Sequence, residues 1–307
     1  MAGGTSWLHR AADSDIWWSF KSSTLTVVAA VVTVLIVAIA FLSPLLAPHT
    51  PFDPATLSLS DGLKPPAWMT DGDWSFVLGT DDQGRDVLSA IMYGTRLSLV
   101  VGFASVIVSM LMGIALGLVS GYVGGATDAV IMRIADVQLT FPAILVALLI
   151  DGVVRGLISV QRHDEIALFV IIGAIGLSFW VQYARTVRGS VMVEKSKDYV
   201  AAAQLIGLPA PVIMLRHVLP NAMGPILVIA TINLALAVIT EATLSFLGSG
   251  MPDTMPSLGT LIRIGNNYLF SGEWWIVAFP GVALAALILS INLLGDWLRD
   301  ALNPKLR

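Results

Sequence analysis

The 307-residue sequence contains no cysteine and few charged residues. Without cysteine, no disulfide bond can join its loops and no thiolate metal site can form. Charged residues make up 12% of the chain, about half the share that is usual for soluble domains, whereas hydrophobic residues make up 56%. A soluble fold of this length could not bury so much apolar surface, but a lipid bilayer accommodates it. The composition therefore predicts a polytopic membrane protein.

Motifs for nucleotide binding and catalysis are also lacking. A P-loop ends in Gly-Lys because backbone N–H groups and the lysine cradle the phosphates, yet none of the five lysines follows a glycine. The histidines are scattered, and the cluster of His163, Asp164 and Glu165 is predicted to lie in a solvated outer loop rather than to bind a metal. No basic patch indicates nucleic acid. We therefore expect no enzyme activity, no metal site and no nucleic-acid partner.

Six apolar windows are long enough to cross a membrane, for which a helix needs about 20 residues. The third window is the weakest, because Arg133 and Asp136 lie near one end and would have to reach an interface. The sequence thus predicts an all-α fold with six transmembrane helices. After an N-terminal segment over 1–24, the predicted spans cover residues 25–47, 97–121, 129–150, 166–185, 222–247 and 275–295.

Lysine and arginine are biased toward one side of these spans. With the N-terminus inside, eleven of the seventeen fall in predicted cytoplasmic segments, which places both termini in the cytoplasm. On this assignment residues 48–95 form an outer, periplasmic loop, 186–221 an inner loop and 296–307 a cytoplasmic tail. The outer loop is most simply a solvated ectodomain. The alternative is that it meets a binding protein or folds over the outer mouth.

The inner loop has the pattern of a docking element. We expect a short Ala-rich helix that ends at Gly207, where glycine suits a left-handed C-cap. A second helix and a proline stop would then precede the fifth span, where Pro220 can start a new helix and fix its entry angle. A helix with small residues beneath the membrane suits docking of a soluble partner. The alternative is an interfacial helix that rests on lipid headgroups.

The same loop resembles the "EAA" loop of inner-membrane subunits of binding-protein-dependent ABC importers. Ala202, Ala203, Gly207, Leu219 and Pro220 fall in register with that motif, and Ala201 replaces its glutamate. The stretch LGTDDQGRD over 78–86 resembles the LGTDxxGRD signature of C-type permease subunits of the dipeptide/oligopeptide group. Residues 121–136, 241–248 and 292–304 are similar to other segments of that group. The chain is thus identified as a member of this family, with the MetI-like permease fold.

This resemblance implies a multi-pass subunit of the bacterial inner membrane, in an ATP-driven importer for peptides or related small solutes. Its implied partners are a homologous B-type permease subunit, two cytoplasmic ATP-binding subunits that hold ATP and Mg, and a periplasmic substrate-binding protein. The chain itself would bind no cofactor. A stand-alone secondary transporter or channel is the runner-up, and a membrane scaffold is a third class. The residues implied to couple the chain to the ATPases are Ala201, Ala202, Ala203, Gly207, Leu219, Pro220 and Asn221.

Three features inside the predicted spans are candidates for packing or for the solute path. Glu241 lies about 20 residues into the fifth span, roughly 30 Å along it, which predicts a structural or gate-region carboxylate near the outer surface. Asn233 lies near mid-membrane, where an interhelical hydrogen bond is favoured over lining the path. Small residues recur every four positions in the second span and predict close helix packing, within the subunit or against the partner permease: Ser105, Ser109, Gly113, Gly117 and Gly121.

Overall fold

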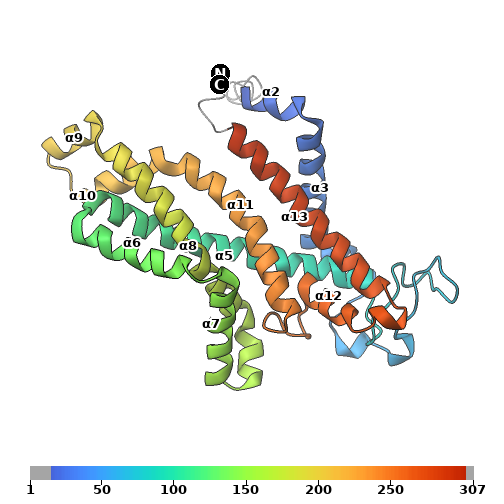
Figure 1. Ribbon diagram of the computed structural model, residues 1–307. Helices are drawn as coiled ribbons and strands as arrows, with labels where there is room; N and C mark the ends of the chain where they lie inside the picture. The colour runs from blue at the N-terminus through green and yellow to red at the C-terminus, as the bar shows by residue number, and fades with distance from the viewer. Residues whose placement is uncertain (1–14, 302–307) are drawn as a thin grey trace.

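The computed structural model describes residues 15–301, and that part of the chain is helical, with a single isolated β-bridge between Thr80 and Asp86 (Figure 1). The N-terminal segment before residue 15 and the end of the tail after residue 301 lie outside the described residues. The first half contains α2 (Asp15–Ser22), α3 (Thr24–Phe41), α4 (Ser43–Leu46), η1 (Pro54–Thr56), η2 (Leu59–Asp61), α5 (Val87–Val123), α6 (Gly125–Leu139) and α7 (Ala143–Leu157). The second half contains α8 (Val160–Lys195), α9 (Asp198–Leu205), α10 (Ala210–Val212), the π-helix η3 (Ile213–Val218), α11 (Leu219–Phe246), α12 (Leu258–Asn266), η4 (Leu269–Ser271) and α13 (Trp275–Ala301).

Five helices in the described part of the chain are long and apolar enough to cross a membrane: α3, α5, α8, α13 and the continuous helix over 210–246. The third predicted span differs from the expectation of one helix over 129–150. It consists of α6 and α7, which meet at an angle of 91° and count as a sixth span only if taken together. Proline lacks an N–H donor and disfavours helical conformation in the residue before it, so Pro142 separates the two helices: α6 ends at Leu139 and α7 begins at Ala143.

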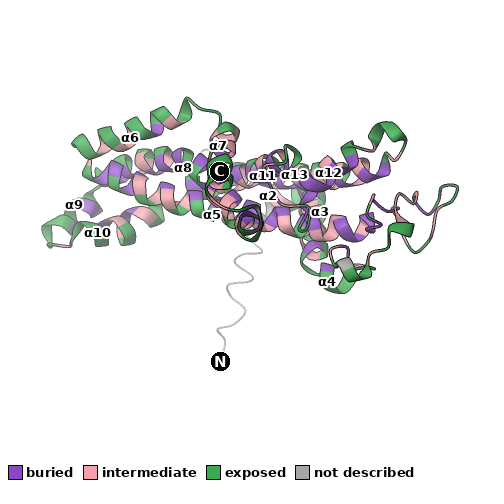
Figure 2. Cartoon of the chain, turned by 90° about the horizontal axis from the view of Figure 1, so that it is seen from below, coloured by how far each residue is buried: buried purple, intermediate pink, exposed green. Residues whose placement is uncertain are grey.

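The two longest helices form the centre of the bundle. Helix α5 has 37 residues and α8 has 36, about 55 Å each at 1.5 Å per residue, so both extend well beyond a hydrocarbon layer of about 30 Å. Buried residues gather where α5 and α8 run side by side, whereas α6 is largely exposed (Figure 2). Helix α7 and the first turns of α8 project from the bundle as a hairpin (Figure 1).

Functional segments lie at opposite ends of the molecule. Helices α9 and α10 lie at one end, and the segment over 47–86, together with α12, lies at the other (Figures 1 and 2). Helix α3 lies at the edge of the bundle and exposes an apolar face, including Val31 at 52% and Val34 at 65% exposed. In a bilayer such a face meets acyl chains.

Candidate functional site

Helix α9 is the short Ala-rich helix that the sequence predicts in the inner loop. It ends at Leu205, and Gly207 adopts a left-handed conformation with φ of +79°. The Gly207 N–H donates to the Gln204 carbonyl at 3.0 Å and the Leu208 N–H donates to the Ala203 carbonyl at 3.1 Å. This pair of bonds is a Schellman motif, which closes the helix by satisfying two of its last carbonyls. The predicted glycine C-cap is therefore confirmed.

Most of the residues predicted to couple lie on the surface of this segment, but two have internal roles. Ala201, Ala202, Gly207 and Pro220 are exposed, and Leu219 is half-buried. Ala203 is only 4% exposed, because it packs in a core cluster, and it is therefore a packing residue.

Sequence reasoning missed the most exposed apolar residues at the end of α9. Leu205 is 89% exposed and Ile206 is 76% exposed. An apolar pair directly before the glycine of a polar inner loop was the signal that could have found them. Large apolar side chains so exposed on a loop outside the bundle indicate a contact surface, for another protein or for the membrane interface.

Asn221 is exposed, yet its side chain is engaged within the chain. Its amide donates to the Tyr199 hydroxyl at 3.1 Å and to the His217 carbonyl at 2.8 Å. The Tyr199 hydroxyl in turn donates to Glu194 at 2.5 Å. Burial raises the pKa of Tyr199, and the Glu194 carboxylate raises it further, so the hydroxyl stays protonated and remains a donor. This chain of hydrogen bonds joins α8, α9 and α11.

Pro220 does not stop a helix, contrary to one part of the expectation, but it lies where a new helix starts, as the other part predicts. Helix α10, the π-helix η3 and α11 follow one another without a break, and Pro220 occupies the first turn of α11. The first turn tolerates proline because its N–H groups have no intrahelical acceptor. The π-helical turn absorbs the change of register before it. The helix over 210–246 therefore runs without interruption from the inner loop into the bundle.

The stripe of small residues on α5 packs within this chain, against α8. All five of its members are buried. A Cβ atom added at Gly113 would lie 2.3 Å from the Tyr183 Cβ, and one added at Gly117 would lie 2.6 Å from the Ala184 carbonyl oxygen. The sequence left open whether this stripe packs within the subunit or against the partner permease, and in the structure it packs within the subunit. The close approach of the two backbones is possible only without side chains at these positions.

Asn233 is fully buried where α11 meets α5 and α8. The Tyr183 hydroxyl lies beside the side chains of Asn233 and Ser109. Neither the Asn233 amide nor the Tyr183 hydroxyl completes a hydrogen bond of good geometry within residues 15–301. The interhelical hydrogen bond predicted for Asn233 and its role in the solute path both stay predictions.

Glu241 is fully buried and does not line an open surface of the subunit. Its carboxylate accepts hydrogen bonds from the Ser98 hydroxyl at 2.8 Å and from the Ser245 hydroxyl at 2.7 Å. The Leu258 N–H also donates to the Ser98 oxygen, at 3.3 Å. The carboxylate thereby ties α11 to α5 and to the start of α12, which fits the predicted structural role. The role at a gate stays a prediction.

The outer segment folds against the bundle, with Asp81 and Asp86 buried, whereas Asp53 and Asp71 stay exposed. Asp81 and Arg85 form an ion pair at 2.6 Å, with side chains 4% and 3% exposed. The Arg85 guanidinium also donates to the Asp253 carbonyl at 3.1 Å, and the Trp275 indole donates to the Thr80 carbonyl at 3.2 Å. The motif over 78–86 therefore attaches the segment to the loop after α11 and to α13.

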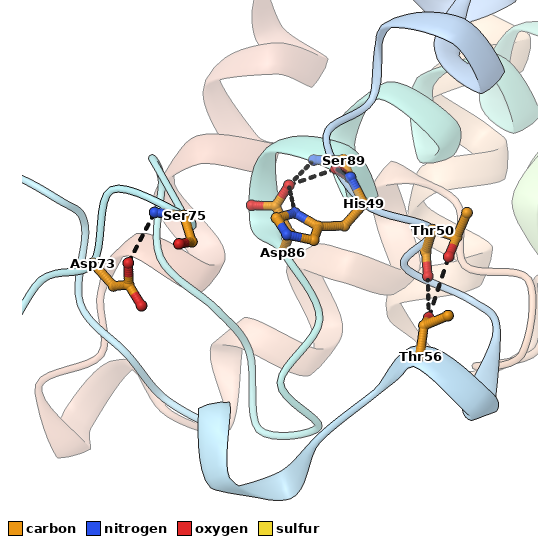
Figure 3. Close-up of polar contacts among 7 residues, drawn as sticks. All are labelled: His49, Thr50, Thr56, Asp73, Ser75, Asp86 and Ser89. Carbon is orange, nitrogen blue, oxygen red and sulfur yellow. Dashed lines mark hydrogen bonds and ion pairs between the residues drawn. The ribbon is translucent and has the colours of Figure 1, made fainter.

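Asp86 ends this motif and begins α5. Its carboxylate accepts hydrogen bonds from the Ser89 N–H at 3.0 Å and from the Ser89 hydroxyl, which is a side-chain N-cap (Figure 3). His49 approaches the same carboxylate at 3.5 Å, and its backbone N–H donates to the Ser89 hydroxyl at 3.1 Å. The carboxylate thus holds both ends of the outer segment.

Ion pairs join α6 to α8. The Asp128 carboxylate accepts two hydrogen bonds from the Arg188 guanidinium, both at 2.6 Å, and Asp136 pairs with Arg185. The sequence resemblance included the two aspartates but not their partners. Asp136 thus has a counter-ion in the same chain. Its charge is compensated there, so the side chain need not extend to the polar surface of the membrane.

His163 is not a solvated loop residue, contrary to expectation. It lies within α8, is 2% exposed, and contacts Asp151 of α7 at 3.0 Å. Arg155 donates to the other oxygen of Asp151 at 2.7 Å. The apolar stretch before Asp151 continues as helix, so the hairpin buries these groups against each other. Among the described residues, no group of three His, Asp or Glu is placed to hold a metal ion.

Five long apolar helices and a broken helix pair among the described residues define the class of this chain as a multi-pass membrane protein. A family model described as "Binding-protein-dependent transport system inner membrane component" matches residues 113–307. A second, described as "N-terminal TM domain of oligopeptide transport permease C", matches residues 14–66.

Curated relatives match nearly the whole chain. The dipeptide transport system permease protein DppC of Haemophilus influenzae is 36% identical, with 95% of each chain covered. The dipeptide transport system permease protein DppC of Escherichia coli K12 is 38% identical, over 95% of this chain and 93% of the relative. The oligopeptide transport system permease protein OppC of Bacillus subtilis is 36% identical, over 95% of this chain and 90% of the relative. This chain belongs to the family of inner membrane components of binding-protein-dependent transport systems, among the dipeptide/oligopeptide ABC permeases.

A solved structure confirms the fold. The MetNI methionine ABC transporter in an inward-facing conformation contains a chain that superposes with a TM-score of 0.55 at 20% identity, over 70% of this chain and 96% of that one. The predicted MetI-like permease fold is confirmed. The orientation of the termini stays a prediction.

Proposed function

We propose that this chain is a transmembrane subunit of an ATP-driven importer that moves peptides from the periplasm to the cytoplasm across the bacterial inner membrane. Its partners are a homologous permease subunit, two ATP-binding subunits that hydrolyse ATP, and a periplasmic binding protein. The observation that carries this proposal is α9, a short helix outside the bundle that ends in two exposed apolar residues, Leu205 and Ile206.

The proposed coupling follows from the contacts of α9. The ATP-binding subunits dock on the exposed face of α9 and on its apolar end. When they close on ATP, they shift α9, and the hydrogen bonds of Tyr199 with Glu194 and Asn221 carry the shift to α8 and α11. The bundle then changes between inward-open and outward-open states, a two-state element biased by a remote ligand.

The peptide substrate rests on the relatives, whose names specify dipeptides, di- and tripeptides or oligopeptides. Uptake of a labelled dipeptide and a labelled tripeptide into proteoliposomes that contain the complete transporter tests this part. Uptake of neither peptide, with intact ATP hydrolysis, would contradict the substrate class and leave the coupling role standing.

Substitution Gly207→Arg tests the docking role. The left-handed conformation is unfavourable for arginine, and the added side chain stands on the docking face. We expect the variant to insert normally but to lose the ATP-binding subunits on co-purification, with uptake falling about tenfold or more.

Gly248→Arg is the matched control. Gly248 has the same left-handed backbone, with φ of +80° and open space around its Cβ position, but lies after α11 at the opposite end of the molecule. We expect it to retain the ATP-binding subunits. Retention in Gly207→Arg as well would contradict the docking role. Uptake by the unmodified chain without any ATP-binding subunit would favour a secondary transporter.

A further inference from the structure

A half-open pocket lies beside the first turns of α5, at the end of the bundle that carries the outer segment. It has a volume of about 370 Å³. Phe52 and Tyr93 form one wall as an edge-to-face pair with centroids 5.9 Å apart. The lining consists of Phe52, Tyr93, Arg96, Leu97, Val100, Thr254, Met255 and Pro256.

Arg96 is a cation without a partner in this pocket. Its side chain is exposed, and it takes part in no ion pair or side-chain hydrogen bond within residues 15–301. The other arginines at this end of the molecule differ from it: Arg85 pairs with Asp81 and Arg263 pairs with Asp253. An unpaired guanidinium at the edge of a membrane requires an anion or water, and a planar fork of donors suits phosphate.

An exposed apolar stripe continues from Arg96 along the same face of α5. Phe103 is 45% exposed, Ile107 is 49% exposed and Leu111 is 60% exposed. These residues follow Arg96 and Val100 at spacings of three and four, so they lie in one row on the helix. The row from Arg96 to Leu111 is about 22 Å long, enough to cross one leaflet of about 15 Å.

We propose that this pocket and stripe bind a phospholipid, with the phosphate diester on the Arg96 guanidinium and one acyl chain along Val100, Phe103 and Ile107. An anionic head on a long apolar tail is the chemistry that fits a cation at the top of an apolar row. A peptide in transit fits it poorly, because the row offers no partner for the peptide backbone. Tyr93 and Phe52 lie where aromatic residues meet headgroups. The proposal rests on the membrane location alone and not on the coupling role of α9.

The site borders the segment that leads into α12. Thr254, Met255 and Pro256 line the pocket, and Ser257 caps α12. The bound headgroup would therefore rest against the loop that joins α11 to α12.

The test compares phospholipid retention in Arg96→Gln and Arg162→Gln. Each variant of the full-length chain is recovered from membranes in mild detergent with the proteins that co-purify with it, and bound phosphatidylglycerol and phosphatidylethanolamine are counted by native mass spectrometry. Arg162 is an exposed arginine at the start of α8 that does not line this pocket, so its loss removes the same charge elsewhere. We expect about tenfold weaker retention in Arg96→Gln, the effect of losing one charge-assisted hydrogen bond, and no change in Arg162→Gln.

Three further measurements make the result decisive. Arg96→Lys keeps the charge and should keep most of the lipid. Phe103→Ser should weaken retention without touching the charge, which also tests the proposal if Arg96→Gln fails to fold. Inorganic phosphate should not displace the lipid, because it lacks the acyl chain. Equal retention in all variants would overturn the proposal, and so would loss of the lipid whenever the partner permease is bound, which would assign this face to the permease interface.

Discussion

At the scale of single residues, buried ionic groups in the outer half of this chain are held by partners in the same chain. The Asp81–Arg85 pair is the clearest case, because both side chains are almost fully buried and Arg85 also reaches the Asp253 carbonyl. The Glu241 carboxylate is held instead by two serine hydroxyls. Removing one partner of such a pair leaves a charge in a place where water cannot reach it.

We predict that Arg85→Met destabilises the folded protein. The change leaves the Asp81 carboxylate buried without its counter-ion, which costs about 3–5 kcal/mol. The measurement is the thermal unfolding midpoint in detergent. Lys64→Met is the control, because Lys64 makes its ion pairs with Asp61 and Asp73 at the exposed surface. An equal fall in both variants would contradict the importance of burial.

The deficit of Arg85→Met should depend on pH. Burial already raises the pKa of Asp81 in the folded protein, and loss of Arg85 removes a charge that lowers it. The folded state then binds a proton that the unfolded state does not, so the stability of the variant rises as pH falls from about pH 8 to about pH 5. A deficit that grows toward low pH would contradict this assignment.

At the scale of helices, glycine placement fixes which pair of helices can pack. The Cβ positions of Gly113, Gly117 and Gly121 lie 2.3, 2.6 and 2.9 Å from atoms of α8, so α5 and α8 approach until their backbones nearly touch. Gly173 of α8 has open space instead. Composition alone does not distinguish these glycines, because only the packed structure shows which of them face another helix.

We predict opposite effects for alanine at two of these glycines. Gly117→Ala places a methyl group 2.6 Å from the Ala184 carbonyl oxygen and should destabilise the α5–α8 pair by about 1–3 kcal/mol. Gly173→Ala meets no neighbour and should be neutral or stabilising by up to about 1 kcal/mol, because alanine loses less backbone entropy. Thermal unfolding of the two variants checks this, and tolerance of alanine at both positions would refute the packing.

At the scale of the whole molecule, α9, the proposed docking helix, and the outer segment lie at opposite ends of the bundle (Figure 1). Leu205 at the end of α9 is 89% exposed, and Trp74 in the outer segment is 76% exposed. A membrane that crosses the bundle between them separates the two residues. This separation is required if ATP is used on one side and solute arrives from the other.

Single cysteines test this arrangement, since the natural chain has none to interfere. We predict that Leu205→Cys reacts with a membrane-impermeant maleimide only from the cytoplasmic side and Trp74→Cys only from the periplasmic side. Intact cells and inverted vesicles provide the two exposures. Labelling of both residues from one side would overturn the predicted orientation.

Much of the fold follows from the sequence. The apolar windows around α3, α5, α8, α11 and α13 predict spans because each is long and lacks charge, and the glycine that ends α9 is confirmed as a left-handed cap. Some local predictions were wrong. Pro142 breaks the third window into α6 and α7, and His163 lies buried in α8 where a solvated loop was expected. Pro220 begins α11, as the sequence allowed, without the stop that was also expected.

The sequence by itself determined that this chain lies in a membrane, where five of its long helices run and where α9 ends, because apolar length and glycine conformation are local properties. Only the tertiary structure decided that the small stripe of α5 packs on α8, that Asp81 and Asp86 of the outer segment are buried, and that His163 meets Asp151. Those outcomes depend on which residues distant in sequence come together. The spacing of residues along the chain does not show such contacts.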